Sequence, residues 1–298
     1  MTPFATLWLY AVGVLTAVAL ALSLVAIVLP PTPNACVEFP DACASVMVPL
    51  HRRPAKHDLP PAFQALVSIP RLEQYRLTRL VPGVSDRARE HGDASGGNEA
   101  VNAPPALPIL FVHGHRGSPD QGSALATLAA NLFESADDEL PGSSQVERAP
   151  FVVYSIDFDE ASSAFHSTEL ATQAYFINEC VLSVLNLHPN APQHVVVVAH
   201  SMGGIAARIA FLMPNHVNGS VSTLITLATP HQEHPYNIDS ALHSLFQASN
   251  QQWALLAAGA SDDVGAAQGV LTAPASLLSN VVLVSLAGGP QVRQSWSR

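Results

Sequence analysis

The chain has few charged residues, few basic residues and few cysteines, and each shortage excludes a class of protein. Only 12% of its 298 residues are charged, and the net charge is -10 with 13 lysines and arginines. This excludes the basic surface that nucleic-acid binding needs. Three cysteines are too few for a domain built on disulfides, although Cys36 and Cys43 either bridge in an oxidising compartment or stay unpaired. With 48% hydrophobic residues, the chain can bury one large α/β core.

The apolar run Leu7–Leu29 contains no charged residue and is long enough to cross the hydrocarbon core of a bilayer, which is about 30 Å thick. A cleaved signal peptide normally has a basic start and an apolar stretch of about 7–15 residues. This run is longer and no lysine or arginine precedes it. We therefore predict an uncleaved transmembrane anchor within residues 1–30. The nearest basic residues, Arg52 and Arg53, are too distant to set its orientation.

Residues 31–107 are predicted to form a connector that follows the anchor. Pro30–Pro61 is rich in proline, which indicates irregular chain, whereas Ile69–Val81 alternates loosely and predicts one early strand. Pro82–Pro105 is rich in glycine, serine, aspartate and asparagine, which predicts a flexible surface loop.

From residue 108 to residue 298, short apolar runs alternate with helical patterns. Leu170–Leu185, for example, carries apolar residues at the 3.6-residue period of a helix face. Strands that alternate with helices form right-handed crossovers, and these build a parallel sheet covered by helices on both faces. The predicted strands are Ile109–Val112, Phe151–Ile156, Val195–Val198, Thr223–Ala228 and Asn280–Leu286.

The best-defined motif is Ala199-His200-Ser201-Met202-Gly203, which directly follows the valine-rich strand. A nucleophilic serine on a sharp strand-to-helix turn needs small residues two positions before and after it, and alanine here replaces the usual first glycine. Ser201 is therefore the predicted nucleophile of an α/β-hydrolase-type fold. A glycine-rich turn that only closes a βα unit is the structural alternative. His200 is predicted to point away from the substrate and to be structural.

Ester hydrolysis also needs two N–H groups that bind the oxyanion. In this architecture one belongs to the residue after the nucleophile, here Met202, and the other to the loop after an earlier strand. That loop is 113–117, so we predict the second donor among Gly114, His115 and Arg116. The alternative is that its glycine serves only a tight turn.

The acid and the base of a catalytic triad are missing from their usual places. In α/β-hydrolases both follow later strands, but no carboxylate occurs after Asp263 and no histidine after His243. We favour the explanation that these residues lie outside this chain. The alternatives are an unusual pair, such as Asp239 with His231 or His243, and an inactive protein.

Two further polar residues at predicted strand ends, Asp157 and His231, are predicted to line the cleft. His231 and His234 have the spacing of a metal-binding pair, but no third ligand has a known place beside them. We therefore predict no metal site and no cofactor.

At these residues the chain resembles the GPI inositol-deacylase family, over roughly residues 108–289. The most specific part is Asp157-Phe158-Asp159-Glu160 with Ser163-Ala164-Phe165-His166, which is similar to the family's DFNEE…SAFHG segment. His200–Arg208 resembles the family's nucleophile elbow, the strand-to-helix turn that carries the serine. Thr226–His231 resembles its TLSTPH strand end, and Gly114–Ser118 resembles its GNxGS oxyanion loop.

The resemblance implies a membrane-bound, lipase-like enzyme that removes the acyl chain from the inositol of GPI anchors and so supports export of GPI-anchored proteins from the endoplasmic reticulum. It also implies a place in that membrane with the hydrolase domain in the lumen, and with the one anchor predicted at Leu7–Leu29 we expect the chain to cross the membrane once. There the sequon Asn218-Gly219-Ser220 is usable and a Cys36–Cys43 bridge is permitted.

The chain departs from the family after Gly288-Gly289, where the expected aspartate and the later histidine are absent. We therefore expect the hydrolase domain of this chain to be incomplete at its C-terminus. A lipase for another membrane lipid and an inactive membrane-binding module remain as alternatives.

Overall fold

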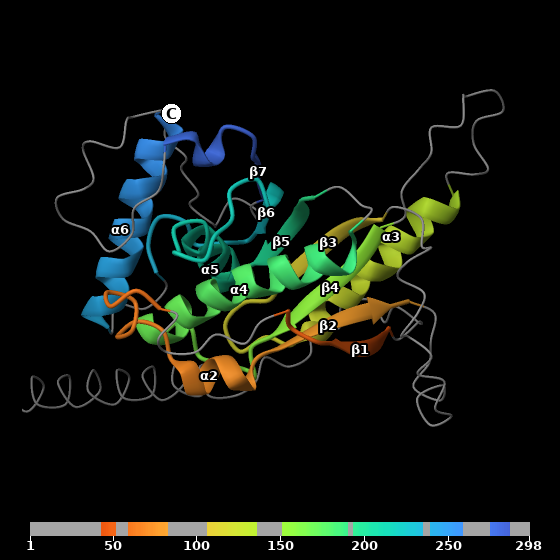
Figure 1. Ribbon diagram of the computed structural model, residues 1–298, viewed down its shortest axis with the longest axis horizontal. Helices are drawn as coiled ribbons and strands as arrows, with labels where there is room; N and C mark the ends of the chain where they lie inside the picture. The colour runs from red at the N-terminus through yellow and green to blue at the C-terminus, as the bar shows by residue number, and fades with distance from the viewer. Residues whose placement is uncertain are drawn as a thin grey trace, which may run out of the picture. The chain divides into compact units, whose positions relative to one another are not determined.

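Seven strands form one sheet in the order β1-β2-β4-β3-β5-β6-β7 (Figure 1). The computed structural model describes residues 43–51, 59–82, 106–135, 151–189, 193–234, 239–258 and 275–286. Its strands are β1 (Ala44–Val48), β2 (Arg76–Val81), β3 (Leu107–Val112), β4 (Phe151–Asp157), β5 (Val195–His200), β6 (Val221–Leu227) and β7 (Val282–Leu286). Its α-helices are α2 (Ile69–Gln74), α3 (Ser123–Ser135), α4 (Ser167–Leu187), α5 (Met202–Ala210) and α6 (Ser240–Ala257).

The five strands from β3 to β7 are parallel to one another, whereas β2 pairs antiparallel with β4, and β1 pairs antiparallel with β2 at the edge. The predicted mostly parallel sheet is thus confirmed. Parallel strands end at the same edge of a sheet, so the segments that follow Val112, Asp157, His200 and Leu227 lie along one rim. This is the rim where α/β sheets bind their ligands.

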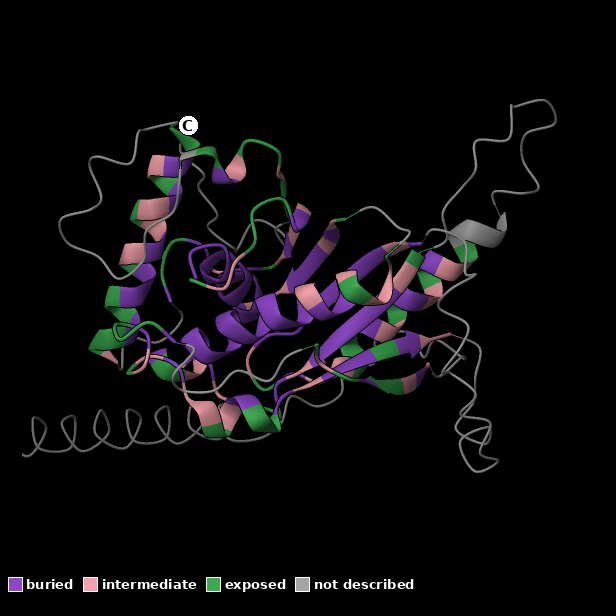
Figure 2. Ribbon diagram, viewed as in Figure 1, coloured by how far each residue is buried: buried purple, intermediate pink, exposed green. Residues whose placement is uncertain are grey.

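Helices cover both faces of the sheet, as predicted. On one face, α4, α5 and α6 pack in the main core with strand residues such as Leu110 and Val197; on the other, α3 packs against Ile109 and Phe111. Figure 2 shows that α4 is buried along most of its length. Because α5, α2 and α6 also contact α4, this helix is buried on more sides than the single apolar face of Leu170–Leu185 indicates.

The predicted connector differs from the structure in two places. Ala44–Val48 forms β1 inside the stretch whose prolines indicate irregular chain, because it pairs with β2 in antiparallel register. Ile69–Val81 is not one strand: α2 begins at Ile69 with a proline in its first positions, and only 76–81 extend as β2.

The predicted anchor Leu7–Leu29 and Cys36 lie outside the described residues. Among the helices that are described, none has both the length and the apolar character required to cross a membrane. Cys43 is half-buried, and its thiol lies 3.6 Å from the Ser123 carbonyl oxygen and 3.7 Å from the Thr127 hydroxyl. Its pairing with Cys36 stays a prediction.

Candidate active site

Ser201 lies between β5 and α5 on a strained turn. Its backbone torsions are φ 52° and ψ -126°, a conformation that residues other than glycine rarely adopt. The Ser201 N–H donates to the Leu227 carbonyl at 2.8 Å, and the Ser201 carbonyl accepts from the Gly204 N–H at 3.0 Å. The neighbouring strand and the new helix therefore both hold the strained turn.

The glycines that follow Ser201 are required by close packing. A methyl group on Gly203 would overlap the backbone carbonyls of Val112 and His113, and one on Gly204 would overlap the side chain of Thr229. The start of α5 thus lies directly against the ends of β3 and β6. This explains why the position two after the serine must be small.

The loop after β3 contacts the nucleophile. A Cβ atom on Gly114 would lie 2.8 Å from the Ser201 Cβ and 3.3 Å from the Met202 nitrogen. That nitrogen begins α5, where N–H groups have no partner within the helix. The Gly114 backbone and the Met202 N–H therefore flank the same point beside Ser201.

Hydrogen bonds within the described residues narrow the choice of the second oxyanion donor. The Arg116 N–H donates to the Ala161 carbonyl at 3.2 Å, and the Gly117 N–H donates to the Gly114 carbonyl at 3.1 Å. This removes Arg116 from the three predicted donors. The N–H groups of Gly114 and His115 remain as those that the loop can offer to an oxyanion.

His113 fixes the position of this loop. Its ring is fully buried, its Nδ1 lies 2.9 Å from the Gly114 carbonyl oxygen, and its Nε2 accepts the Phe158 N–H at 3.2 Å. Burial lowers the pKa of His113, so the ring is neutral and Nδ1 carries the proton. In this form it ties the loop to the end of β4.

His115 makes a second tie to the segment after β4. Its Nδ1 accepts the Ala164 N–H at 3.1 Å, and its ring packs edge-to-face on Phe165 with centroids 4.8 Å apart. Burial and then the positive charge of Arg116 lower the pKa of His115. The neutral ring therefore carries its proton on Nε2.

Asp157 stabilises a turn. Its Oδ1 accepts the Asp159 N–H at 2.9 Å, and Asp159 and Glu160 both have positive φ angles, 52° and 51°. The partly exposed Asp157 carboxylate thus holds the left-handed turn that leaves β4.

His231 supports the end of β6. Its Nδ1 lies 3.3 Å from Nη1 of Arg208, and its Nε2 lies 2.9 Å from the Thr226 hydroxyl and 3.4 Å from the Ser285 hydroxyl. Burial, and then the charge of Arg208, lower the pKa of His231 to about 4. Both ring nitrogens have partners, which indicates a structural role for this histidine.

Arg208 itself is a structural residue that sequence reasoning missed. It is only 4% exposed, its guanidinium lies 4.9 Å from the centroid of the Trp253 ring, and the Trp253 indole N–H donates to its carbonyl at 3.1 Å. Its contacts join α5 to α6. The sequence signal was one arginine inside the otherwise apolar helix Met202–Ala210.

Asp239 connects two helix ends. Its Oδ1 accepts the Ala241 N–H at 2.9 Å as the N-cap of α6, and its Oδ2 accepts the Ser167 N–H at 3.1 Å where α4 begins. The bond from Ser167 is the main reason that the pKa of Asp239 is lowered. The alternative triad pair of Asp239 with His231 or His243 therefore gains no support, because the carboxylate serves as a cap.

Two absences apply to the described part of the chain. No histidine nitrogen there hydrogen-bonds the Ser201 hydroxyl, and no three His, Cys, Asp or Glu side chains are grouped as metal ligands. His234 packs its ring against His243, with centroids 5.5 Å apart, and against Phe246.

The buried neutral histidines predict that acid destabilises the fold. The pKa values of His231 and His216 are each lowered from 6.5 to about 4, so their contribution is complete above pH 6.5 and is lost as pH falls toward 4. We expect each to remove about 2 kcal/mol of unfolding free energy between pH 7.5 and pH 5. Urea unfolding of the native chain and of His231→Gln measures this, and the variant should lose less stability than the native chain. Equal losses in both proteins would contradict the role given to His231.

A mostly parallel sheet, a strained serine after an inner parallel strand and a glycine loop beside that serine define the α/β-hydrolase fold. Within this fold, residues 104–297 match the PGAP1-like alpha/beta domain family, and the chain belongs to that family.

Fungal proteins are similar to this chain over part of their length. GPI inositol-deacylase of Schizosaccharomyces pombe is 33% identical over 64% of this chain, and that of Phaeosphaeria nodorum is 32% identical over 61% of it. The chain spans 17% of the length of each of these relatives. Mature Bacillus licheniformis lipase BlEst2 superposes with a TM-score of 0.32 and 20% identity, over 44% of this chain and 43% of the lipase.

Proposed function

We propose that this chain is the hydrolase part of a serine esterase that removes the acyl chain from the inositol of GPI anchors. The observation that carries the proposal is the contact between the Gly114 backbone and the strained Ser201, with the Met202 nitrogen at the same point. Membership of the PGAP1-like family and similarity to proteins named GPI inositol-deacylase support this substrate.

In the proposed reaction, the Ser201 Oγ attacks the carbonyl carbon of the inositol ester while a histidine takes the serine proton. The oxyanion that forms accepts hydrogen bonds from the Met202 N–H and from the N–H of Gly114 or His115. The C–O bond to the inositol then breaks, the histidine returns the proton to the inositol oxygen, and the acyl group stays on Ser201. Water cleaves this ester and releases the fatty acid. We propose that the histidine and its acid lie outside the described residues.

The substrate is tested by mass spectrometry of GPI lipids after incubation with the full chain in detergent. We expect the GPI mass to fall by one acyl group on the inositol, with release of the matching fatty acid. Loss of an acyl chain from glycerol instead, or from lipids without inositol, would favour the alternative of a lipase for another membrane lipid.

We further propose that the chain is held in the endoplasmic reticulum membrane with its hydrolase domain in the lumen, where export of GPI-anchored proteins begins. Asn218 of the sequon is exposed and precedes Gly219, which has a positive φ of 80° and open space around it. In a eukaryotic secretory expression system, Asn218 should therefore carry a glycan. A mobility shift that is lost in Asn218→Gln supports the lumenal location, and an unmodified Asn218 counts against it.

A non-catalytic binding module is the second candidate function. It is favoured by one observation: within the described residues, no histidine hydrogen-bonds Ser201. A fluorophosphonate probe separates the two candidates, because it bonds covalently only to an activated serine. Labelling of the native chain at Ser201 would exclude the binding module, and a folded but unlabelled chain would fit either the binding module or an esterase whose histidine lies outside this chain.

A further inference from the structure

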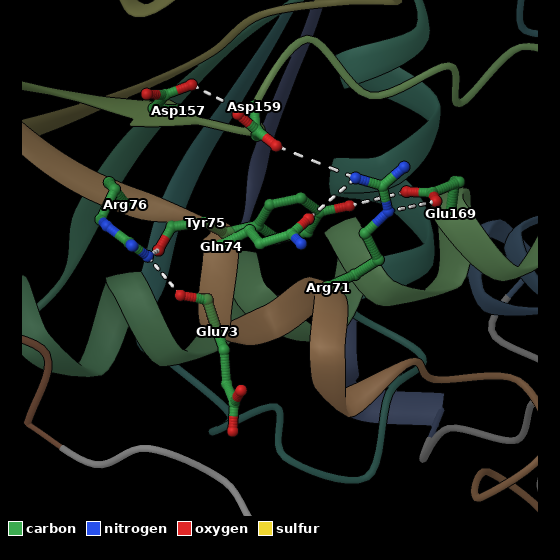
Figure 3. A network of polar contacts seen from close by, with 8 residues as sticks. All are labelled: Arg71, Glu73, Gln74, Tyr75, Arg76, Asp157, Asp159 and Glu169. Atoms are coloured by element: carbon green, nitrogen blue, oxygen red, sulfur yellow. Dashed lines mark hydrogen bonds and ion pairs between the residues drawn. The ribbon is translucent and has the colours of Figure 1, made fainter.

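Two residues at the end of α2, Arg71 and Tyr75, both bind the carboxylate of Glu169 on α4. We call these three residues the Arg71 bracket. Arg71 Nε donates to Glu169 Oε1 at 2.8 Å, and the Tyr75 hydroxyl donates to Glu169 Oε2 at 2.9 Å (Figure 3). The Glu169 side chain is 14% exposed and Tyr75 is 1% exposed. Burial and then the Glu169 charge raise the pKa of Tyr75, which keeps its hydroxyl a donor. The bracket thus joins the end of α2 to the first turn of α4.

The bracket also holds the turn that follows β4. The Arg71 guanidinium lies 3.8 Å from the Asp159 carboxylate, and Figure 3 shows it between Asp159 and Glu169. The Tyr75 ring packs edge-to-face on Phe158, with centroids 5.2 Å apart, and Phe158 is fully buried. The turn therefore has an exposed ion pair at Asp159 and a buried ring contact at Phe158.

The backbone conformation of this turn is unfavourable by itself. Asp159 and Glu160 are consecutive residues in the left-handed region, and such residues cost free energy unless their surroundings hold them. The Asp157 carboxylate supplies one hydrogen bond to the turn, and the Ala161 N–H donates a second across it to the Phe158 carbonyl at 3.1 Å. The bracket adds the ion pair with Asp159 and the ring contact with Phe158.

The segment 158–164, which contains this turn, is bonded to the loop 113–117, here called the oxyanion loop. Three hydrogen bonds connect the two: Phe158 N–H to His113 Nε2, Arg116 N–H to the Ala161 carbonyl, and Ala164 N–H to His115 Nδ1, at 3.1–3.2 Å. A shift of the segment would therefore move the loop. Because the loop offers its N–H groups beside Ser201, such a shift would misalign the oxyanion donors.

We propose that Arg71, Tyr75 and Glu169 are positioning residues that hold the segment 158–164 and, through it, keep the oxyanion loop aligned with Ser201. This inference rests on the proposed function, because it assigns the bracket a task in ester hydrolysis. None of the three residues touches the reacting atoms; they act through Phe158 and Asp159.

Amide hydrogen exchange of the full chain tests the inference without requiring activity. The variants are Tyr75→Phe, which removes only the hydroxyl, and Glu169→Gln, which removes only the charge. Tyr154→Phe is the matched control, because Tyr154 is 2% exposed and its hydroxyl lies 2.8 Å from His188 Nε2, where α4 ends.

We expect exchange in 113–117 and 158–164 to become about tenfold faster in the two bracket variants. The same segments should keep their native rate in Tyr154→Phe, and β5 should keep it in all three variants. Equal exchange in all the proteins, or faster exchange spread evenly over the sheet, would overturn the inference.

Turnover of a short soluble ester separates positioning from a merely structural role. In Glu169→Gln, kcat should fall about tenfold while KM stays within about twofold, because donor alignment matters in the transition state. Arg71→Lys keeps a cation beside Glu169 and should restore most of the kcat that Arg71→Ala loses. If the native chain is active and Glu169→Gln keeps its kcat, the positioning role is wrong. If the native chain itself is inactive, either the proposed function fails or the histidine lies outside this chain, and hydrogen exchange still decides whether the three residues hold the loop.

Discussion

Replacement of Ser201 by alanine should abolish covalent labelling by a fluorophosphonate and lower ester hydrolysis by more than about 10⁴-fold. The reason is that the Ser201 oxygen forms the bond to the acyl carbon. Labelled protein is counted by intact-mass spectrometry, and hydrolysis is followed with the soluble ester.

The matched control for this prediction is Ser249→Ala. Ser249 is buried on α6, and its hydroxyl has no partner within the described residues. Removing that hydroxyl relieves an unpaired polar group, so the fold should be unchanged or more stable by up to about 1 kcal/mol. Native labelling in Ser249→Ala with none in Ser201→Ala assigns the chemistry to Ser201. Undiminished labelling of Ser201→Ala would place the nucleophile elsewhere.

Gly114→Ala should lower kcat by about 10²–10³-fold, which corresponds to about 3–4 kcal/mol of lost transition-state stabilisation. The added methyl would lie 2.8 Å from the Ser201 Cβ and 3.0 Å from the His200 carbonyl oxygen, so the loop must withdraw from the nucleophile. Withdrawal separates the N–H groups of Gly114 and His115 from that of Met202.

Gly219→Ala is the matched control for Gly114→Ala. A methyl there meets nothing within 4 Å, although the φ of 80° at Gly219 is unfavourable for alanine. It should therefore cost about 1 kcal/mol of stability and leave kcat unchanged. Thermal unfolding and kcat are measured on both variants. Native kcat in Gly114→Ala would show that the 113–117 loop supplies no oxyanion donor.

The strand-to-helix turn that carries Ser201 could be predicted from the sequence because its physical requirements are local. Val195–Val198 is continuous and apolar, and Gly203 has to be small since it meets the carbonyls at the end of β3. Gly114 was predictable for the same reason, as a glycine in the loop after a strand. The alternation of strands and helices likewise determined the sheet from β3 to β7.

Features that depend on distant partners could not be read in this way. β1 forms because Ala44–Val48 pairs with β2, and Tyr75 meets Glu169 across 94 positions of the chain. Asp239 looked like a triad acid in a sequence that lacks one, but its carboxylate caps two helices that only the folded chain brings together. His231 lies at a strand end as predicted, but its two ring nitrogens contact the side chains of Arg208 and Thr226.

The most direct measurement is a crystal structure of the chain after reaction with a phosphonate ester that imitates the tetrahedral intermediate. The account predicts phosphorus bonded to the Ser201 Oγ. It also predicts a phosphonyl oxygen about 2.7–3.1 Å from the Met202 nitrogen and from the nitrogen of Gly114 or His115. A phosphonyl oxygen turned away from these nitrogens, or a reagent bonded to another residue while Ser201 stays free, would contradict it.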